Sequence, residues 1–166
     1  MICIVFGTNE KWTSKFIRWV TQSPWSHVGI EYPSAVWGGR WVANSQADGV
    51  VKIPIEQFEA TYPTRKVYEC GPNMADGFQW ARNHINADYD YGVVWNAFVL
   101  VLYRMTGWRW LWKIVTRNAA KFSCSEFVCG FMRAAKVTGA MRLDPELTPP
   151  GDLDKFCASS DDFRVR

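Results

Sequence analysis

The chain has 166 residues, a formal net charge of +3 and 48% hydrophobic residues. A chain of this length can bury one sizeable core without disulfides or a structural metal, so we expect a single domain spanning residues 1–166. Its five cysteines include no CxxC pair, which argues against a zinc site and a disulfide framework, and we expect no metal and no cofactor.

The first half of the chain predicts one helix and several strands. Residues 1–6 are apolar, lack a basic leader and end at Gly7, so they predict a buried strand rather than a signal peptide, and synthesis in the cytoplasm. Residues 11–21 have apolar side chains at helical spacing and predict a short helix. Strands are predicted at residues 25–32, 40–45, 50–53 and 64–70, of which the first three are antiparallel neighbours.

Polar residues on two of these strands are candidates for chemistry. Alternation in residues 25–32 places His27, Gly29 and Glu31 on one face, and the glycine leaves room for another group to approach the imidazole ring. On the next strand, Asn44 and Gln46 share a face and can accept an N–H from that ring. The alternatives are a hydrogen-bonded core histidine and an asparagine that belongs to a turn or a sheet edge.

Another helix is predicted from an Asn73 cap, with Met74 and Phe78 toward the core. It leaves His84 near its C-terminal end without an evident orienting partner, so His84 is not an expected catalyst. Residues 88–92 predict a polar turn. Residues 93–103 are almost wholly apolar but fall short of the roughly 20 residues that a transmembrane helix needs.

The segment between Tyr91 and Ser125 holds five basic residues, four interleaved tryptophans and no acidic residue. This mixture suits contact of residues 93–121 with an anionic membrane or cell-wall surface, and we expect one or two helices there that border the site. The alternative is that the tryptophans belong to the core and the charges to a solvated face. No nucleic-acid-binding module is recognisable, so nucleic acid is not an expected partner.

A helix start signal follows directly. Ser123 and Glu126 have the spacing of a capping box, which makes Cys124 the first helical residue. The positive end of the helix favours an anion, so we expect the pKa of this thiol to fall from about 8.5 to roughly 3.5–7.5. Apolar spacing up to residue 135 predicts a core-facing helix that Gly139 ends, and the alternative is a buried cysteine acting as a small apolar side chain. Residues 147–153 predict a rigid turn, and residues 163–166 an edge strand.

A cysteine at a helix start, a histidine on a strand and a polar residue on the next strand are the parts of a thiol hydrolase. Motifs in a fixed order cover most of the chain: IRWVTQSPWSHVGI at residues 17–30, YDY at 89–91, CSEFV at 124–128 and LTPPGDL at 147–153. In these motifs the sequence resembles the circularly permuted papain-like amidases of the YaeF/YiiX type, relatives of the NlpC cell-wall peptidases. The resemblance also includes lipid-acting acyltransferases of the lecithin:retinol type.

The resemblance implies Cys124 as the nucleophile, His27 as the base and an oxyanion contribution from Tyr89. Many such relatives carry glutamate or histidine at the position that aligns with Asn44, although papain-like enzymes also use asparagine. The groups that could orient the histidine are Asn44, Gln46 and Glu31.

We therefore expect an α+β, circularly permuted papain-like fold. In it, an antiparallel sheet that bears His27 and Asn44 packs on the helix beginning at Ser123, and this packing brings the faces of His27 and Cys124 together. Further candidate substrate-binding residues are Ser26, Gln46, Asp90 and Ser125.

The expected function is that of a cysteine amidase or endopeptidase that cleaves amide bonds in bacterial peptidoglycan stem peptides, which need hydrogen-bonding groups near the nucleophile. The alternatives are a lipid acyl-hydrolase, acyltransferase or thioesterase of the same fold, with an apolar channel from residues 93–103, and a non-catalytic binding module. We expect a monomer unless the chain belongs to a larger assembly. Without a signal peptide, action on the cell wall would need another export route, such as phage lysis or a secretion or tail apparatus.

Overall fold

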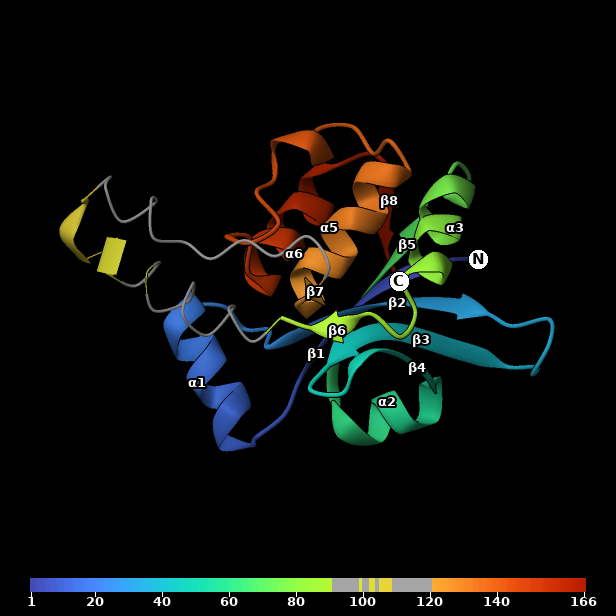
Figure 1. Cartoon of the computed structure of the whole chain (residues 1–166), viewed down its shortest axis with the longest axis horizontal. Helices are drawn as coiled ribbons and strands as arrows, with labels where there is room; N and C mark the ends of the chain where they lie inside the picture. The colour runs from blue at the N-terminus through green and yellow to red at the C-terminus, as the bar shows by residue number, and fades with distance from the viewer. Residues whose placement is uncertain (91–98, 100–101, 104, 109–120) are drawn as a thin grey trace.

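The structure, a computed structural model, describes residues 1–90, 99, 102–103, 105–108 and 121–166. Six strands form one antiparallel sheet in the order β4-β3-β2-β1-β5-β8 (Figure 1). Their bounds are β1 Cys3–Thr8, β2 His27–Pro33, β3 Arg40–Gln46, β4 Gly49–Pro54, β5 Thr64–Cys70 and β8 Phe163–Val165. A second sheet pairs two short strands in parallel, β6 (Asp88–Tyr89) and β7 (Lys121–Phe122).

Helices lie on both faces of the six-stranded sheet, which confirms the expected α+β class (Figure 1). Their bounds are α1 Trp12–Thr21, α2 Ile55–Thr61, α3 Ala75–Asn83, α5 Cys124–Ala134 and α6 Pro150–Ser159, with a short 3-10 helix at Ala140–Arg142. Helix α2 lies against one face of the sheet, whereas α5 lies against the other with α3 and α6 beside it. Helix α1 lies to one side of these layers (Figure 1).

Alternation along the strands divides the core into two layers. On the α5 side, Ile4 and Val28 pack with Phe127 in the larger cluster of buried residues. On the α2 side, Val5 and Phe58 belong to a second, smaller cluster. Each fully buried side chain of this size contributes roughly 1.5–3 kcal/mol of hydrophobic stabilisation. Because successive side chains of a strand point to opposite faces, the side chain of His27, the residue before Val28, lies on the α2 side of the sheet.

The structure confirms the helix predicted at residues 11–21 and the edge strand predicted at residues 163–166. It also confirms the strands predicted at residues 1–6, 25–32, 40–45, 50–53 and 64–70. The N-cap of α3 is Met74, so the prediction of an Asn73 cap is wrong. The rigid turn predicted at residues 147–153 is also wrong in part, because α6 begins within it at Pro150. Proline fits a first helical turn, where its missing N–H has no intrahelical partner to lose. Helix α2 was not predicted, and α5 ends at Ala134 rather than at Gly139.

The predictions for residues 93–103, an apolar run, and for residues 93–121, one or two basic helices rich in tryptophan, fall largely outside the residues that the structure describes. Within the described residues, none of the helices combines the length and the apolar composition that crossing a membrane requires.

Candidate active site

Helix α5 begins at the cysteine because its first turn is capped from both directions. The Glu126 backbone N–H donates to the Ser123 hydroxyl at 3.3 Å, and the Ser123 backbone N–H donates to the Glu126 carboxylate. The predicted capping box is therefore confirmed, and Cys124 is the first residue of the helix. The box uses the amides of Ser123 and Glu126, so the amides between them, of Cys124 and Ser125, face the end of the helix.

Two neighbours form hydrogen bonds with the partly exposed Cys124 thiol. The backbone of Val28 bonds to it, as do the side chain and the backbone of Ser125. Val28 can bond there because the pairing of β2 with β3 begins at Ile30. Burial nevertheless raises the thiol pKa more than these bonds lower it. The expected fall to roughly 3.5–7.5 is therefore wrong, since the cost of desolvating a thiolate outweighs the positive charge of the helix end.

The His27 ring is held from the next strand by Asn44. Nε2 of the ring lies 2.9 Å from Oδ1 of Asn44, and Nε2 of Gln46 donates to the same oxygen at 2.8 Å. Because an amide oxygen only accepts, the imidazole carries its proton on Nε2, and Nδ1 keeps its lone pair. Gly29 permits this approach, since a Cβ at that position would lie 3.0 Å from Cβ of Asn44.

His27 lies on the opposite face of the sheet from α5. Its ring stacks on Tyr62 with 4.8 Å between centroids and an interplanar angle of 8°, and the Phe58 ring is 6.0 Å away. The expectation that packing of α5 on the sheet brings the faces of His27 and Cys124 together is therefore wrong. The two residues come near each other at the end of β2: His27 is its first residue, and the next residue, Val28, bonds to the thiol.

Tyr62 lies beside both candidate catalytic groups. Tyr62 follows α2 directly and packs on Gly7. A Cβ added to Gly7 would lie only 2.7 Å from the Cβ of Tyr62. Burial raises the pKa of the Tyr62 hydroxyl, and the nearby charge of an ionised Cys124 raises it further. No sequence pattern marks this residue, because a tyrosine in a Thr-Tyr-Pro turn has no periodic relation to the strands.

Burial also keeps the His27 ring neutral. Desolvation lowers its pKa from 6.5 to about 4, and the hydrogen bond with Asn44 offsets part of that effect. Since the thiol pKa is raised and the imidazole pKa is lowered, the resting pair near neutral pH is an uncharged thiol and an uncharged imidazole. Such a base removes the thiol proton as the sulfur attacks rather than beforehand.

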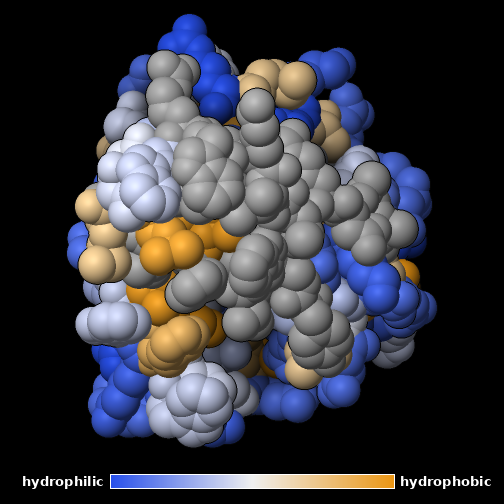
Figure 2. Space-filling model, turned by 60° about the vertical axis from the view of Figure 1, so that its left-hand side comes forward, coloured by the Kyte–Doolittle hydropathy of each residue, from blue (hydrophilic) through white to orange (hydrophobic). Residues whose placement is uncertain are grey.

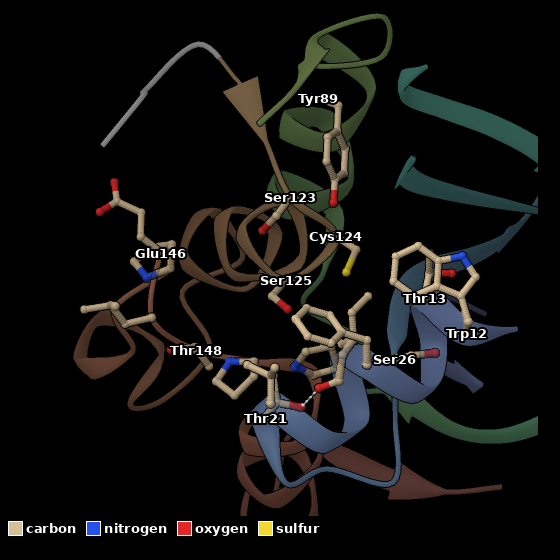
Figure 3. Close-up of a pocket in the computed structure, with 17 residues that line it drawn as sticks. Trp12, Thr13, Thr21, Ser26, Tyr89, Ser123, Cys124, Ser125, Glu146 and Thr148 are labelled. Carbon is tan, nitrogen blue, oxygen red and sulfur yellow. Dashed lines mark hydrogen bonds between the residues drawn. The ribbon is translucent and has the colours of Figure 1, made fainter. Parts of the chain in front are cut away.

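A cavity of about 260 Å³ opens in front of the thiol (Figure 3). One wall is α1, the other is the segment of residues 145–150, and the start of α5 lies at its inner end. The apolar part of the lining comes from Trp12, Phe16, Ile17, Val20, Pro145, Leu147, Pro149 and Pro150. The candidate nucleophile thus faces a channel whose lining is mostly apolar, with Ser123, Ser125 and Tyr89 near the sulfur and Thr13, Thr21, Glu146 and Thr148 elsewhere along its walls.

Tyr89 and Ser125 are the predicted site residues that lie in this cavity beside Cys124. Tyr89 is placed there by the short parallel sheet, because it pairs with Phe122, two residues before the cysteine. Its hydroxyl points toward Cys124 in Figure 3. Ser125 follows the cysteine in the first turn of α5 and bonds to its thiol.

The remaining candidates have other surroundings. Ser26 also lines the cavity, but its hydroxyl lies 2.6 Å from that of Ser14, which fastens α1 to the sheet. Asp90 is buried near Glu126, and Glu31 pairs with Arg40 rather than with the histidine. The Gln46 side chain contacts Asn44, to whose Oδ1 it donates a hydrogen bond.

His84 does not line the cavity: its Nδ1 lies 2.8 Å from the Trp80 carbonyl oxygen, and its ring stacks on Trp80. Among the described residues, no group of three or more His, Cys, Asp or Glu side chains could hold a metal ion.

No protein-family model matches the chain, and no curated protein matches it. Among solved structures, the chain is similar to the metalloprotein YiiX from Escherichia coli O157:H7, with a TM-score of 0.64 and 15% sequence identity. The match covers 99% of this chain and 94% of that chain. At this identity the likeness concerns the fold alone, and it gives the chain a YiiX-like α+β fold.

Proposed function

We propose that the protein is a cysteine hydrolase in which Cys124 is the nucleophile and His27 is the base. The observation that carries this proposal is the position of the thiol. The thiol lies at the N-terminus of α5, faces the cavity and forms a hydrogen bond with the backbone of Val28, the residue next to His27. The order of histidine before cysteine and the YiiX-like fold support the same assignment.

The chemistry has two halves. First, Nδ1 of His27 takes the thiol proton while Sγ of Cys124 bonds to the substrate carbonyl carbon, whose electron pair moves to oxygen. When that pair returns, the bond to the amine, alcohol or thiol of the substrate breaks, this leaving group takes the proton from the imidazolium, and a thioester with Cys124 remains. Water then attacks the thioester, His27 receives its proton, and the carboxylic acid leaves as the thiol is reprotonated.

Three further residues support these steps. Asn44 keeps the proton on Nε2 of His27 and stabilises the imidazolium that forms during attack. The Tyr89 hydroxyl and the Cys124 amide are the donors proposed for the developing oxyanion, since the amide lies at the start of α5 and the hydroxyl of Tyr89, on β6, points toward Cys124. Tyr62 holds the plane of the His27 ring by stacking on it.

Two substrate classes fit this chemistry. Peptide amides of bacterial peptidoglycan are supported by the hydroxyls of Ser26, Tyr89 and Ser125 in the cavity. Lipid acyl esters or acyl thioesters are supported by the apolar walls that α1 and residues 145–150 supply. Because apolar side chains form most of the lining, the geometry favours the acyl class over the stem-peptide amides.

Incubation with purified muropeptides, with phospholipids and with acyl thioesters, followed by mass spectrometry of the products, tests the proposal. We expect loss of an acyl chain that depends on Cys124 and disappears in Cys124→Ala. The matched control is Cys129→Ala, which changes a fully buried cysteine five residues along the same helix. New amine and carboxylate termini on the stem peptide would establish the amidase instead, and the absence of any product that depends on Cys124 would contradict the hydrolase.

A further inference from the structure

Helix α1 has an aromatic row that the described residues leave uncovered. Trp12 and Trp19 are 75% and 72% exposed, and Phe16 and Ile17 between them are 46% and 37% exposed. The ring centroids of Trp12 and Phe16 are 6.4 Å apart, and those of Phe16 and Trp19 are 6.2 Å apart, so the rings form one continuous surface. Figure 2, in which this side comes forward, shows apolar side chains gathered at the surface. Exposed apolar area of this kind marks a binding surface.

Basic side chains flank the aromatic row. Residues 10–21 contain three basic residues, Lys11, Lys15 and Arg18, and a single acidic one, Glu10. Glu10 pairs with Lys15 at 3.2 Å and with Arg18 at 3.3 Å, which leaves this surface with net positive charge. Tryptophan and phenylalanine beside lysine and arginine on one short helix are typical of helices that lie in the plane of a membrane interface.

Three residues of the aromatic row also form the rim of the channel to the candidate nucleophile. Trp12, Phe16 and Ile17 are exposed to solvent and at the same time line the cavity that reaches the Cys124 thiol. Figure 3 shows α1 bordering this cavity, with Trp12 at one end and Thr21 at the other. An acyl chain that enters along α1 therefore contacts mainly apolar side chains on its way to the sulfur.

We propose that α1 is an interfacial helix that seats its aromatic row in an anionic lipid surface, from which an acyl chain passes along α1 to Cys124. The second half of this proposal rests on the proposed hydrolase function, whereas the surface contact does not. Anionic head groups complement Lys11 and Lys15. A second copy of the chain fits this surface less well, because a symmetric contact through α1 would bring the basic residues of both copies together.

The test uses the Cys124→Ala protein, so that binding is measured without turnover. Co-sedimentation with vesicles that contain phosphatidylglycerol is compared with vesicles of phosphatidylcholine alone. We expect binding to the anionic vesicles that weakens with salt, and a loss of about tenfold in partitioning for Trp19→Ser. The matched control is Trp37→Ser, a tryptophan 54% exposed in the loop after β2, which should leave binding unchanged. Lys15→Glu should also weaken binding to the anionic vesicles.

The proposal would be overturned if the protein did not bind the anionic vesicles at low salt. It would also be overturned if Trp19→Ser bound them as well as the protein that keeps Trp19. A dimer that forms with rising concentration and disappears in Trp19→Ser would assign the surface to a second copy instead. Turnover of soluble short-chain acyl thioesters, measured with the protein that keeps Cys124, separates this proposal from the hydrolase function, since Trp19 does not line the cavity. Turnover of these thioesters without vesicle binding refutes the surface alone, and vesicle binding without turnover of any substrate refutes the hydrolase alone.

Discussion

Replacing Glu126 by glutamine should stabilise the protein at neutral and alkaline pH while keeping the helix start, since glutamine also completes a capping box. The Glu126 side chain is only 6% exposed. Burial raises its pKa from 4.5 to about 7, and the charges of Asp90 and Glu146 add to this, while hydrogen bonds from Ser123 oppose it. A group whose folded pKa lies above its unfolded pKa contributes stability that is fully present below the unfolded value and is lost as the pH rises through the folded value.

The window for this loss therefore runs from pH 4.5 to about 7. At about 1.4 kcal/mol per pH unit, the free energy of unfolding of the wild type should fall by about 3 kcal/mol relative to that of Glu126→Gln. Urea unfolding of both proteins at several pH values, followed by tryptophan fluorescence, measures this difference. Subtraction removes the titration of His27, whose lowered pKa gives the opposite slope. A difference that stays constant across the window would refute the reasoning from burial.

Three further predictions concern the histidine. Asn44→Ala should lower kcat by about 10- to 100-fold without abolishing turnover, and Gln46→Ala should cost less; a larger loss for Gln46→Ala would transfer the orienting role to Gln46. The acid limb of kcat/KM should lie near pH 4, because burial lowers the pKa of His27 to about 4, and a limb at pH 6.5 would indicate a solvated ring. Tyr62→Phe should keep the activity while Tyr62→Ala lowers kcat several-fold, because stacking holds the ring; equal losses would give the Tyr62 hydroxyl a role of its own.

The helix start and the strand faces could be predicted because both depend on short-range geometry. Ser123 and Glu126 are three residues apart, and that spacing alone determines which backbone amides they can satisfy. The alternation around His27 likewise puts it on the same face as Gly29, toward Asn44 on the next strand. In each case, the partner lies within a few residues or on the neighbouring strand.

The electrostatics of the site could not be predicted in this way. The positive end of a helix acts on Cys124 in any surroundings, but the opposing cost of burial depends on how β2 and α1 close around the thiol. The choice of face for His27 is similar: alternation says which residues share its side, and only the packed structure shows that α2, with Phe58 and Tyr62, covers that side. Helix α2 itself is short and carries no strong capping signal.

The aromatic residues of α1 show a further limit. Their helical spacing predicts the helix, and the structure confirms it, but the same spacing suits a core-facing stripe and a surface row equally well. The exposure of Trp12 and Trp19 decides between the two. The apolar channel could not be predicted from the sequence either, because its two walls are about 130 residues apart along the chain.

The nucleophile and its base can be tested together by the rate at which a small electrophile such as iodoacetamide labels each cysteine, read by peptide mass spectrometry. The chain provides its own controls, since Cys3, Cys70, Cys129 and Cys157 are all buried and only Cys124 is partly exposed. We predict a single early adduct at Cys124 whose rate of formation falls by at least about tenfold in His27→Gln, because the neutral thiol then lacks its proton acceptor. Labelling of another cysteine before Cys124, or a rate at Cys124 that does not depend on His27, would contradict the proposed catalytic pair.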